Sequence, residues 1–385
     1  MPSLAANKIR VLHVVPVLEV GGIEKGLIDA FAFMDRDRFQ LDFLVERDID
    51  TPLADTARKM GCNIIPVGPF KHLHSFAPAF IKTARQYNTV HAHTYLFSGL
   101  IMVLARVAGV RQRIAHIHSN IPYKPDHLAA FYRGVLKGCI KSCATDIIAV
   151  SRIATAVLYG QERDADGALT IQPMGVDFSK FHESFNAGDT LTSLGIKPDE
   201  QIVVNVSRFT TAKNHEYIIY VFDHMVKQLG FQGRLLLIGE GGLRASIVDK
   251  VEALGLTDAV IFAGTRYDCH NILRALNGVF IFPSLFEGLG LAAVEAQAAG
   301  MPILVSEHVP EEARISDTAC MMVPLSDGVA AWAAAADARI KAPILDRAEV
   351  LREVEQNKIN IKNFVRIISD LYLSANNDMV RPNKH

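Results

Sequence analysis

Short apolar runs alternate with helical patterns along most of this chain. In the first half, the apolar runs lie at residues 11–15, 41–45, 63–67, 89–91, 113–117 and 146–150, and the segments between them carry apolar positions at helical spacing. A short continuous apolar run is typical of a strand that is covered on both faces. The alternation therefore predicts an α/β unit in which helices cover both faces of a parallel sheet.

The pattern pauses at residues 185–198, which are polar, and then begins again. Further strand-like runs follow at residues 201–206, 234–238, 260–262, 278–282 and 302–305. We expect two Rossmann-like parallel-sheet domains, residues 1–185 and 186–358, and a C-terminal helix or tail over residues 359–385 that crosses back to the first domain. Ligands of such sheets bind beyond the carboxyl ends of the strands, so two facing domains would form a central cleft lined by these loops.

Composition agrees with a globular protein of more than one domain. The chain has 385 residues, of which 50% are hydrophobic and 21% charged, and single cores rarely grow beyond about 250–300 residues. Its five cysteines include no C-x-x-C pair, which favours reduced thiols over a disulfide framework or a zinc site. The N-terminus lacks the apolar core of a signal peptide, and the most apolar stretch ends at Arg106. We therefore expect a cytoplasmic protein.

The net charge of -1 conceals an uneven distribution. Between residues 58 and 141 there are twelve Lys or Arg residues and one acid, Asp126. Residues 1–185 carry 21 basic and 17 acidic residues, whereas the remainder carries 19 and 24. The overall balance gives no support for a nucleic-acid partner, and it leaves a local basic surface in the first domain to be explained.

The most informative segment is FPSLFEGLGLAAVEAQAAGMP, which starts at Phe282. A strand ends there, a glycine-rich turn carries Glu287, and a helix follows with Glu295 on it. Unpaired N–H groups at a helix N-terminus attract anions such as phosphate. A carboxylate inside the helix can reach ribose hydroxyls, while the one in the loop stands where a sugar would bind; alone, such a Glu pair would more often be surface decoration.

A second cluster, VSRFTTAKN, follows the strand at residues 201–206. Arg208 and Lys213 lie in this loop, at the sheet edge that also carries the acidic segment. Two cations beside a helix N-terminus suit a diphosphate, because they neutralise it and stabilise charge that develops on a leaving phosphate. A solvated loop with two surface charges is an equally good interpretation of this pair by itself.

Together these segments resemble the retaining glycosyltransferases of family 4, which have the two-domain GT-B fold. The similarity extends over essentially the whole chain, and bacterial exopolysaccharide and capsule glycosyltransferases are the most similar group. It rests on GGIEKGLIDAF, VHAHTYLFSGLIMVLARVAGVRQRIAHIHS, VSRFTTAKNHEYII and FPSLFEGLGLAAVEAQAAGMPILVS.

The resemblance implies a role for each matching residue. His118 and Glu287 would be catalytic, with His118 facing the reacting sugar and the acceptor and Glu287 contacting the donor sugar. The donor site would comprise Gly21, Gly22, Arg208, Lys213, Gly288, Leu289, Gly290, Leu291 and Glu295. In it the cations hold the diphosphate, backbone N–H groups of residues 289–291 fix phosphate and sugar, Glu295 holds the ribose, and the two N-terminal glycines close over the phosphates. A structural role is favoured for His91, His93 and His116.

The resemblance also implies the chemistry. The family transfers a sugar with retention and needs neither a metal nor a cofactor, and the acceptor hydroxyl attacks from the face that the diphosphate leaves. Met174 stands where the family often has Asn, which removes a polar contact there. The run Gly239-Glu240-Gly241 indicates only a tight turn after a strand.

Residues 128–143 form an amphipathic helical pattern with a basic stripe of Arg133, Lys137 and Lys141. A helix whose apolar face lies in the core and whose cationic face is solvated is the simpler interpretation. The alternative is a surface that meets anionic lipid or a lipid diphosphate, which would place the protein peripherally on the inner face of the membrane.

We expect a hexosyltransferase-type enzyme that moves a sugar from a nucleotide-diphosphate donor, with UDP as the favoured nucleotide, to a glycan or lipid-linked glycan acceptor. Two alternatives stay open, a nucleotide-sugar epimerase of the same architecture and a catalytically silent glycan-assembly scaffold. A dinucleotide oxidoreductase is disfavoured, because the first glycine loop lacks the order Gly-x-Gly-x-x-Gly.

Overall fold

The computed structural model describes residues 8–19, 22–118 and 127–376. The chain divides into two compact units, the first formed by Met1–Asp177 with Lys358–His385 and the second by Phe178–Asn357. The observed division thus falls after residues 177 and 357, whereas the sequence placed it after residues 185 and 358. The polar stretch that suggested the boundary contains a short helix of the second unit, α7, Ala187–Thr192.

The first unit contains a seven-stranded parallel sheet in the order β3-β2-β1-β4-β5-β6-β7. Its strands are β1 Ile9–Val14, β2 Phe39–Val45, β3 Ile64–Pro66, β4 Thr89–Ala92, β5 Gln112–Ile117, β6 Asp146–Ala149 and β7 Leu169–Ile171. Its helices are α1 Gly22–Phe33, α2 Pro52–Lys59, α3 Leu73–Ala84, α4 Ser98–Val107, α5 His127–Cys143, α6 Arg152–Tyr159 and α14 Ile361–Ser374. Helices α2 and α14 pack against α1 on one face of the sheet, while α3 and α5 pack against α4 on the other.

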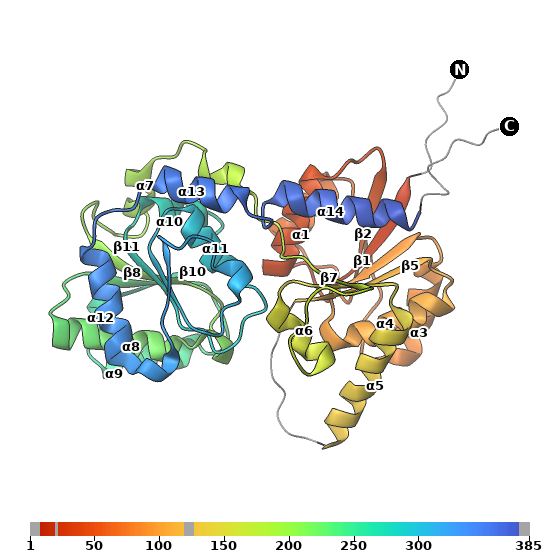
Figure 1. Ribbon diagram of the computed structural model, residues 1–385, viewed down its shortest axis with the longest axis horizontal. Coiled ribbons are helices and arrows are strands. Elements are labelled where there is room, and N and C mark those ends of the chain that lie inside the picture. The colour runs from red at the N-terminus through yellow and green to blue at the C-terminus, as the bar shows by residue number, and fades with distance from the viewer. Residues whose placement is uncertain (1–7, 20–21, 119–126, 377–385) are drawn as a thin grey trace. The chain divides into compact units, whose positions relative to one another are not determined.

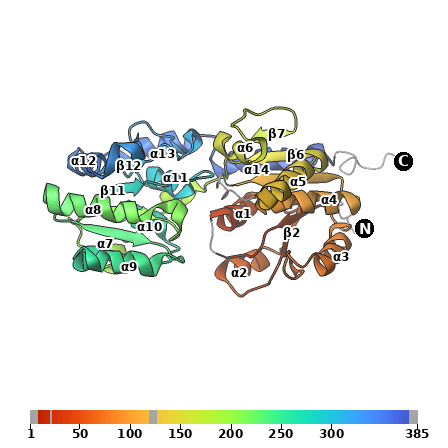
Figure 2. The same ribbon diagram turned by 90° about the horizontal axis from the view of Figure 1, so that it is seen from below.

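The second unit contains a six-stranded parallel sheet in the order β10-β9-β8-β11-β12-β13. Its strands are β8 Gln201–Val206, β9 Arg234–Ile238, β10 Val260–Gly264, β11 Asn277–Phe282, β12 Ile303–Val305 and β13 Cys320–Met322. Its remaining helices are α8 His215–Leu229, α9 Arg244–Ala253, α10 Cys269–Ala275, α11 Leu291–Ala298, α12 Gly328–Lys341 and α13 Arg347–Gln356. Figures 1 and 2 show helices on both faces of this sheet, with α8 beside α12 and α11 beside α13.

The two sheets confirm the predicted α/β fold, and burial explains why its strands were visible in the sequence. Parallel strands that helices cover on both faces are apolar throughout, and β1 and β8 are buried along most of their length. The largest buried side chain, Trp332 of α12, belongs to the second unit's core.

The C-terminal helix α14 joins the first unit through a backbone crossing. Val176 and Asn360 form an isolated parallel bridge, and the N–H of Val176 donates to the carbonyl of Ile359. Gly175 allows this close approach, because a Cβ there would lie 2.8 Å from the Cα of Ile361. The crossing brings Tyr372, near the end of α14, to a fully buried position in the first unit.

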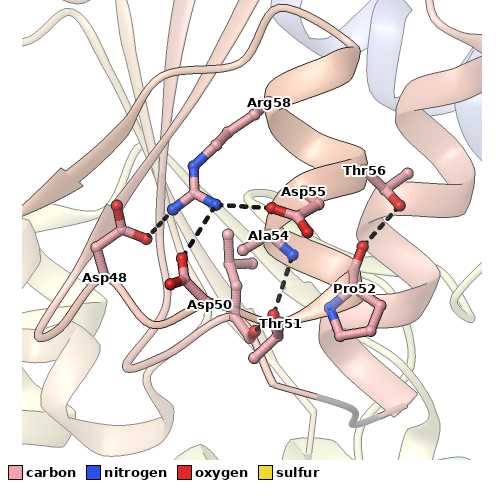
Figure 3. A network of polar contacts seen from close by, with 9 residues as sticks. Asp48, Asp50, Thr51, Pro52, Ala54, Asp55, Thr56 and Arg58 are labelled. Carbon is pink, nitrogen blue, oxygen red and sulfur yellow. Dashed lines mark hydrogen bonds and ion pairs between the residues drawn. The ribbon is translucent and has the colours of Figure 1, made fainter.

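In the first unit, local hydrogen bonds and ion pairs fix the start of helix α2. The side chain of Thr51 accepts a hydrogen bond from the N–H of Ala54 at 3.1 Å (Figure 3), which is an N-cap. Arg58, in the last turn, contacts Asp55 at 3.0 Å and Asp48 at 2.6 Å. The loop after β2 is thereby tied to the helix that follows it.

Helix α5 differs from the expectation that its whole apolar face is buried. Leu136 and Ile140 are buried, but Phe131, Tyr132 and Val135 are 73%, 53% and 46% exposed. Helices α5 and α4 approach closely at Gly99, where a Cβ would lie 2.3 Å from the carbonyl oxygen of Leu136. Among the described residues, Phe131, Tyr132 and Val135 therefore form an exposed apolar surface on α5.

Within the described residues, no helix is long and apolar enough to cross a membrane.

Candidate functional site

In the second unit, the candidate site residues lie where the order of strand addition reverses, which is the topological switch point of the sheet. Strands β8 and β11 are the first and fourth strands of this sheet in sequence but are neighbours in it. Open parallel sheets bind ligands at such a switch point, beyond the carboxyl ends of the two strands. The loop after β8 carries Arg208 and Lys213, and the loop after β11 carries Glu287.

Lys213 and Glu287 form an ion pair across this switch point. The Lys213 ammonium lies 2.5 Å from Oε1 of Glu287 and 5.2 Å from the centre of the Phe282 ring. The hydroxyl of Ser284 donates to the same Oε1 at 2.8 Å, and Glu287 is only 5% exposed. Both contacts converge on Oε1, so among the described residues Oε2 is the carboxylate oxygen that remains for a ligand.

Backbone contacts hold the two loops together. The N–H of Leu285 donates to the carbonyl of Ala212 at 2.8 Å, and the side-chain amide of Asn214 donates to the carbonyl of Pro283 at 3.1 Å. Asn214 adopts a left-handed conformation with φ 56°, which Asn tolerates better than most residues. The position of Lys213 relative to Glu287 is therefore fixed by the backbone as well as by charge.

Helix α11 begins beside this pair. Gly290 is its N-cap and has φ 92° and ψ 53°, a conformation that favours glycine. Gly288, Leu289 and Leu291 surround it, and Glu295 is half-buried one turn into the helix. Because the first N–H groups of a helix lack intrahelical partners, this turn can bind an anion.

Arg208 is exposed and lies earlier in the loop that carries Lys213. The glycine turn after β9 packs against that loop, a function that the sequence did not reveal. A Cβ at Gly239 would lie 2.1 Å from the carbonyl oxygen of Ser207, and one at Gly241 would lie 2.6 Å from that of Phe209. Both glycines also have positive φ, at 137° and 158°. Glycine is therefore favoured here both by the backbone conformation and by the close approach of the two loops.

His215, which carried no predicted role, supports the same loop through Phe209 and Ser207. Its ring stacks on Phe209 at 4.1 Å, and its Nε2 lies 3.3 Å from the hydroxyl of Ser207. Burial, and then the nearby charge of Lys213, lower the pKa of His215 to about 4. A single His in an otherwise polar run gives no signal of such stacking, because Phe209 and His215 meet only through the turn between them.

In the first unit, histidines gather at the corresponding switch point, between β1 and β4. His13 lies on β1, His91 on β4 with His93 just after it, and His116 on β5 with His118 just after it. Four of the five rings are at most 5% exposed, and His118 is half-buried. Of the two glycines predicted nearby, Gly22 begins α1 and is exposed, whereas Gly21 lies outside the described residues.

Burial dominates the electrostatics of these rings. It lowers the pKa of His118 to about 3 and holds the pKa values of His13, His91, His93 and His116 well below their usual range, with mutual repulsion adding to the effect. All five imidazoles are therefore neutral at pH 7, and each keeps one nitrogen lone pair.

Two groups of these histidines have nitrogen atoms within 4.8 Å of one another, which a metal ion could bridge, namely His13 with His91 and His93, and His93 with His116 and His118. The facing nitrogens are closer than that. They lie 2.8 Å apart for His93 and His118 and 3.0 Å apart for His13 and His93, which is the range of hydrogen bonds.

Comparison with known proteins places this geometry in a family. The family described as Glycosyl transferases group 1 matches residues 189–320. A protein named as the glycosyltransferase EpsF of Bacillus subtilis strain 168 is 30% identical over 336 residues, which cover 84% of this chain and 86% of that protein. The chain belongs to the group 1 glycosyltransferases. It is therefore a transferase, as the resemblance implied.

Further relatives and solved structures agree in extent and fold. The UDP-Gal:alpha-D-GlcNAc-diphosphoundecaprenol alpha-1,3-galactosyltransferase of Escherichia coli is 25% identical over 78% of this chain and 80% of its own. The structure of HepE from Anabaena in complex with UDP and glucose matches with a TM-score of 0.79 at 18% identity, over 95% of this chain and 100% of that one. WaaG, a glycosyltransferase of lipopolysaccharide biosynthesis, matches with a TM-score of 0.68 at 14% identity, over 96% and 98%. These likenesses confirm the GT-B fold class.

Proposed function

We propose that this group 1 glycosyltransferase moves a sugar from a UDP-sugar to a hydroxyl of a lipid-linked glycan, with retention, in exopolysaccharide or capsule biosynthesis. The observation that carries the proposal is the paired Lys213 and Glu287 beside the glycine-rich start of α11. A cation, a helix N-terminus and a buried carboxylate provide separate partners for a diphosphate and for a sugar hydroxyl.

The relatives support the finer parts of the proposal. The HepE structures contain UDP, UDP-glucose, or UDP with glucose. The Escherichia coli relative is named for a UDP-sugar donor and a diphosphoundecaprenol acceptor. A Staphylococcus aureus relative, 25% identical over 80% of this chain, is named for capsular polysaccharide biosynthesis.

Each predicted residue has a role in this mechanism. Lys213 and Arg208 bind the diphosphate together with the N–H groups of residues 289–291, and Glu295 binds the ribose. Oε2 of Glu287 receives a hydroxyl of the donor sugar. For the first unit, the resemblance assigns Gly21 and Gly22 to the donor phosphates and His118 to the reacting sugar, and these roles stay predictions; Gly21 lies outside the described residues.

The reaction needs no enzymic nucleophile in this proposal. The bond between the sugar carbon and the leaving phosphate oxygen breaks, and the acceptor oxygen forms its bond to the same face of that carbon. The acceptor proton passes to the leaving phosphate oxygen, so that charge and atoms balance without a metal. Lys213 stabilises the negative charge that develops on the phosphate.

A donor screen followed by a transfer assay tests the proposal. We expect UDP-sugars to raise the melting temperature and GDP-sugars to leave it unchanged, because a ligand at 100 times its Kd stabilises by about 2.7 kcal/mol. With a lipid-linked acceptor, UDP release should depend on that acceptor, persist in EDTA, and give a product with the anomeric configuration of the donor. Donor isomerisation without acceptor would indicate an epimerase, and donor binding without either reaction a silent scaffold.

We also propose that α5 contacts an anionic membrane surface, which would bring a lipid-linked acceptor to the enzyme. The helix carries exposed Phe131, Tyr132 and Val135 and, beside them, the basic stripe residues Lys137 and Lys141. Burial, and then the repulsion of Lys141 and Arg133, lower the pKa of Lys137, and an anionic surface would offset this repulsion. Such a surface combines apolar insertion with charge attraction.

Vesicle sedimentation measures this contact. Since each cation near an anionic surface contributes about 1 kcal/mol, we expect the variant Lys137→Gln/Lys141→Gln to bind phosphatidylglycerol vesicles about 30-fold more weakly. The control Lys358→Gln/Lys362→Gln makes the same charge change at exposed positions of the same unit and should bind normally. Equal loss in both variants, or none in either, would contradict an α5 contact.

A further inference from the structure

The five histidines of the first unit are connected into one chain of hydrogen bonds by Tyr372. From one end, Nδ1 of His116 lies 3.2 Å from Nε2 of His91, and Nδ1 of His91 lies 2.8 Å from the hydroxyl of Tyr372. That hydroxyl lies 3.4 Å from Nε2 of His13. Three strands and the C-terminal helix α14 thus contribute to one network.

The chain continues from His13 to the half-buried end. Nδ1 of His13 lies 3.0 Å from Nε2 of His93, and Nδ1 of His93 lies 2.8 Å from Nε2 of His118. At every link, the ring nearer to His116 contributes Nδ1 and the ring nearer to His118 contributes Nε2. The rings are therefore ordered head to tail along the whole network.

This order makes the tautomers of the five rings interdependent. A neutral imidazole carries one N–H and one lone pair, so a ring that donates through Nδ1 must accept through Nε2. Tyr372 likewise has one O–H and transmits the direction from His91 to His13. Either all five rings carry the proton on Nδ1 or all five carry it on Nε2.

The buried end selects between these two states. Nε2 of His116 is buried and has no hydrogen-bond partner among the residues that the structure describes. If every ring carried its proton on Nε2, this end would be a buried N–H without an acceptor, which is rarer and more costly than a buried lone pair without a donor. With the proton on Nδ1 throughout, the N–H groups of His116, His91, His13 and His93 all have acceptors. The fifth N–H belongs to the half-buried His118, and the buried end keeps only an unused lone pair.

We infer that this head-to-tail network holds all five histidines in the Nδ1–H tautomer, so that His118 presents an N–H donor to an oxygen of the bound substrate. Tyr372 and His93 are then positioning residues that act through His118. The inference rests on the proposed function for its ligand, which is a hydroxyl or phosphoryl oxygen that can accept a hydrogen bond.

A metal ion explains the geometry less well. Two imidazole nitrogens on a tetrahedral zinc lie about 3.4 Å apart, since each Zn–N bond is about 2.05 Å long. The facing nitrogens of His93 with His118 and of His13 with His93 are closer, at 2.8 and 3.0 Å. The rings of His116 and His118 are also stacked, with centres 4.0 Å apart, rather than fanned around one point.

Nitrogen NMR of the full chain, labelled with ¹⁵N-histidine and free of ligand, tests the inference directly. At pH 7.5 we expect His13, His91, His93, His116 and His118 each to show a protonated Nδ1 and an unprotonated Nε2, the minority tautomer of free histidine. Single His→Gln variants assign the signals. Nε2–H signals, rapidly averaged tautomers at His118, or the shifts and metal content of a zinc-bound protein would each overturn it.

The variant Tyr372→Phe distinguishes a connected network from five independent rings. Without the hydroxyl, His91 and His116 form an isolated pair in which either tautomer leaves one buried N–H unpaired, so we expect mixed tautomers at these two. His13, His93 and His118 should keep Nδ1–H, because their buried end still favours a lone pair. Unchanged signals at His91 and His116 would contradict the connection.

The matched control is Tyr87→Phe, which removes a buried hydroxyl that donates to Asp42 at 2.8 Å in the same unit and should leave all five histidines unchanged. Because the spectra need no substrate, failure of the network and failure of the proposed transferase reaction are separate results. An active enzyme with averaged histidine tautomers would refute only the network.

Discussion

Replacing Lys213 by Met is expected to lower kcat/KM for sugar transfer by about 10²–10³-fold, the usual effect of removing one preorganised charge-stabilising group. The ammonium lies 2.5 Å from Glu287 and 5.2 Å from the Phe282 ring, so its position is fixed before a donor binds. Most of the loss should fall on kcat, because charge on the phosphate increases as the sugar bond breaks. A steady-state assay with the native donor and acceptor measures it.

Stability measurements separate this role from a structural one. Lys213→Met leaves the buried carboxylate of Glu287 with Ser284 as its remaining partner, and breaking a buried ion pair in this way costs about 3 kcal/mol. The double variant Lys213→Met/Glu287→Gln removes both charges and should recover most of the unfolding free energy but none of the activity. Recovery of both would show that the pair serves folding alone.

A surface lysine of the same unit gives the control. Lys227 pairs with Asp223 at 2.5 Å on helix α8, away from the switch point, and its side chain is 45% exposed. Lys227→Met should therefore retain wild-type transfer. If Lys213→Met also transferred sugar at the wild-type rate, the assignment of the diphosphate site would be wrong.

Lowering the pH from 7.5 to 5.5 is expected to destabilise the first unit far more than the second. The folded-state pKa values of His13, His91, His93 and His116 lie well below the ordinary value because the rings are buried. The unfolded chain takes up protons near pH 6.5 while the folded unit does not, so stability falls as the pH decreases below that value. The loss is about 1.4 kcal/mol per ring, hence roughly 5 kcal/mol for the four.

The two units can be followed independently. Trp332, the only tryptophan of the chain, lies in the core of the second unit, so its fluorescence reports denaturant unfolding there. In that unit the lowered pKa of His215, about 4, predicts a loss of about 1.4 kcal/mol over the same pH range. Hydrogen exchange of strands β1, β4 and β5 reports the first unit.

A substitution within the cluster checks the origin of the effect. His116→Gln removes one buried imidazole and should reduce the pH dependence of the first unit by about one quarter of the four-ring effect. The control His224→Gln lies on α8 of the second unit and should leave the first unit's pH dependence unchanged. Equal pH dependence in both units would contradict the burial argument.

The sequence indicated the histidine motifs but not the contacts between them. VHAH and AHIHS stand at the ends of two predicted strands, and His118 was assigned a role through the resemblance. Their connection depends on His13, which the sequence analysis did not consider, and on Tyr372, which is 359 residues from His13 in sequence. No local pattern announces such a contact, because it exists only when β1, β4, β5 and α14 are packed together.

For the basic helix α5, the sequence predicted the helix but not the burial of its apolar residues. The spacing of its apolar residues predicts the helix, which the structure places at His127–Cys143. It did not predict that Phe131 and Tyr132 would be exposed, because helical periodicity identifies a face but not the width of the surface that covers it.

By itself the sequence determined the two parallel-sheet units and the residue types at their strand ends, because strands buried on both faces are apolar throughout and glycine-rich turns are local signals. It also located Lys213 and Glu287 in loops that follow strands. Only the tertiary structure decided that these two, 74 residues apart, form an ion pair, and that five histidines and a tyrosine share one network. Both results depend on which strands become neighbours at a switch point. Strand order is a property of the packed sheet, and no single segment of the sequence specifies it.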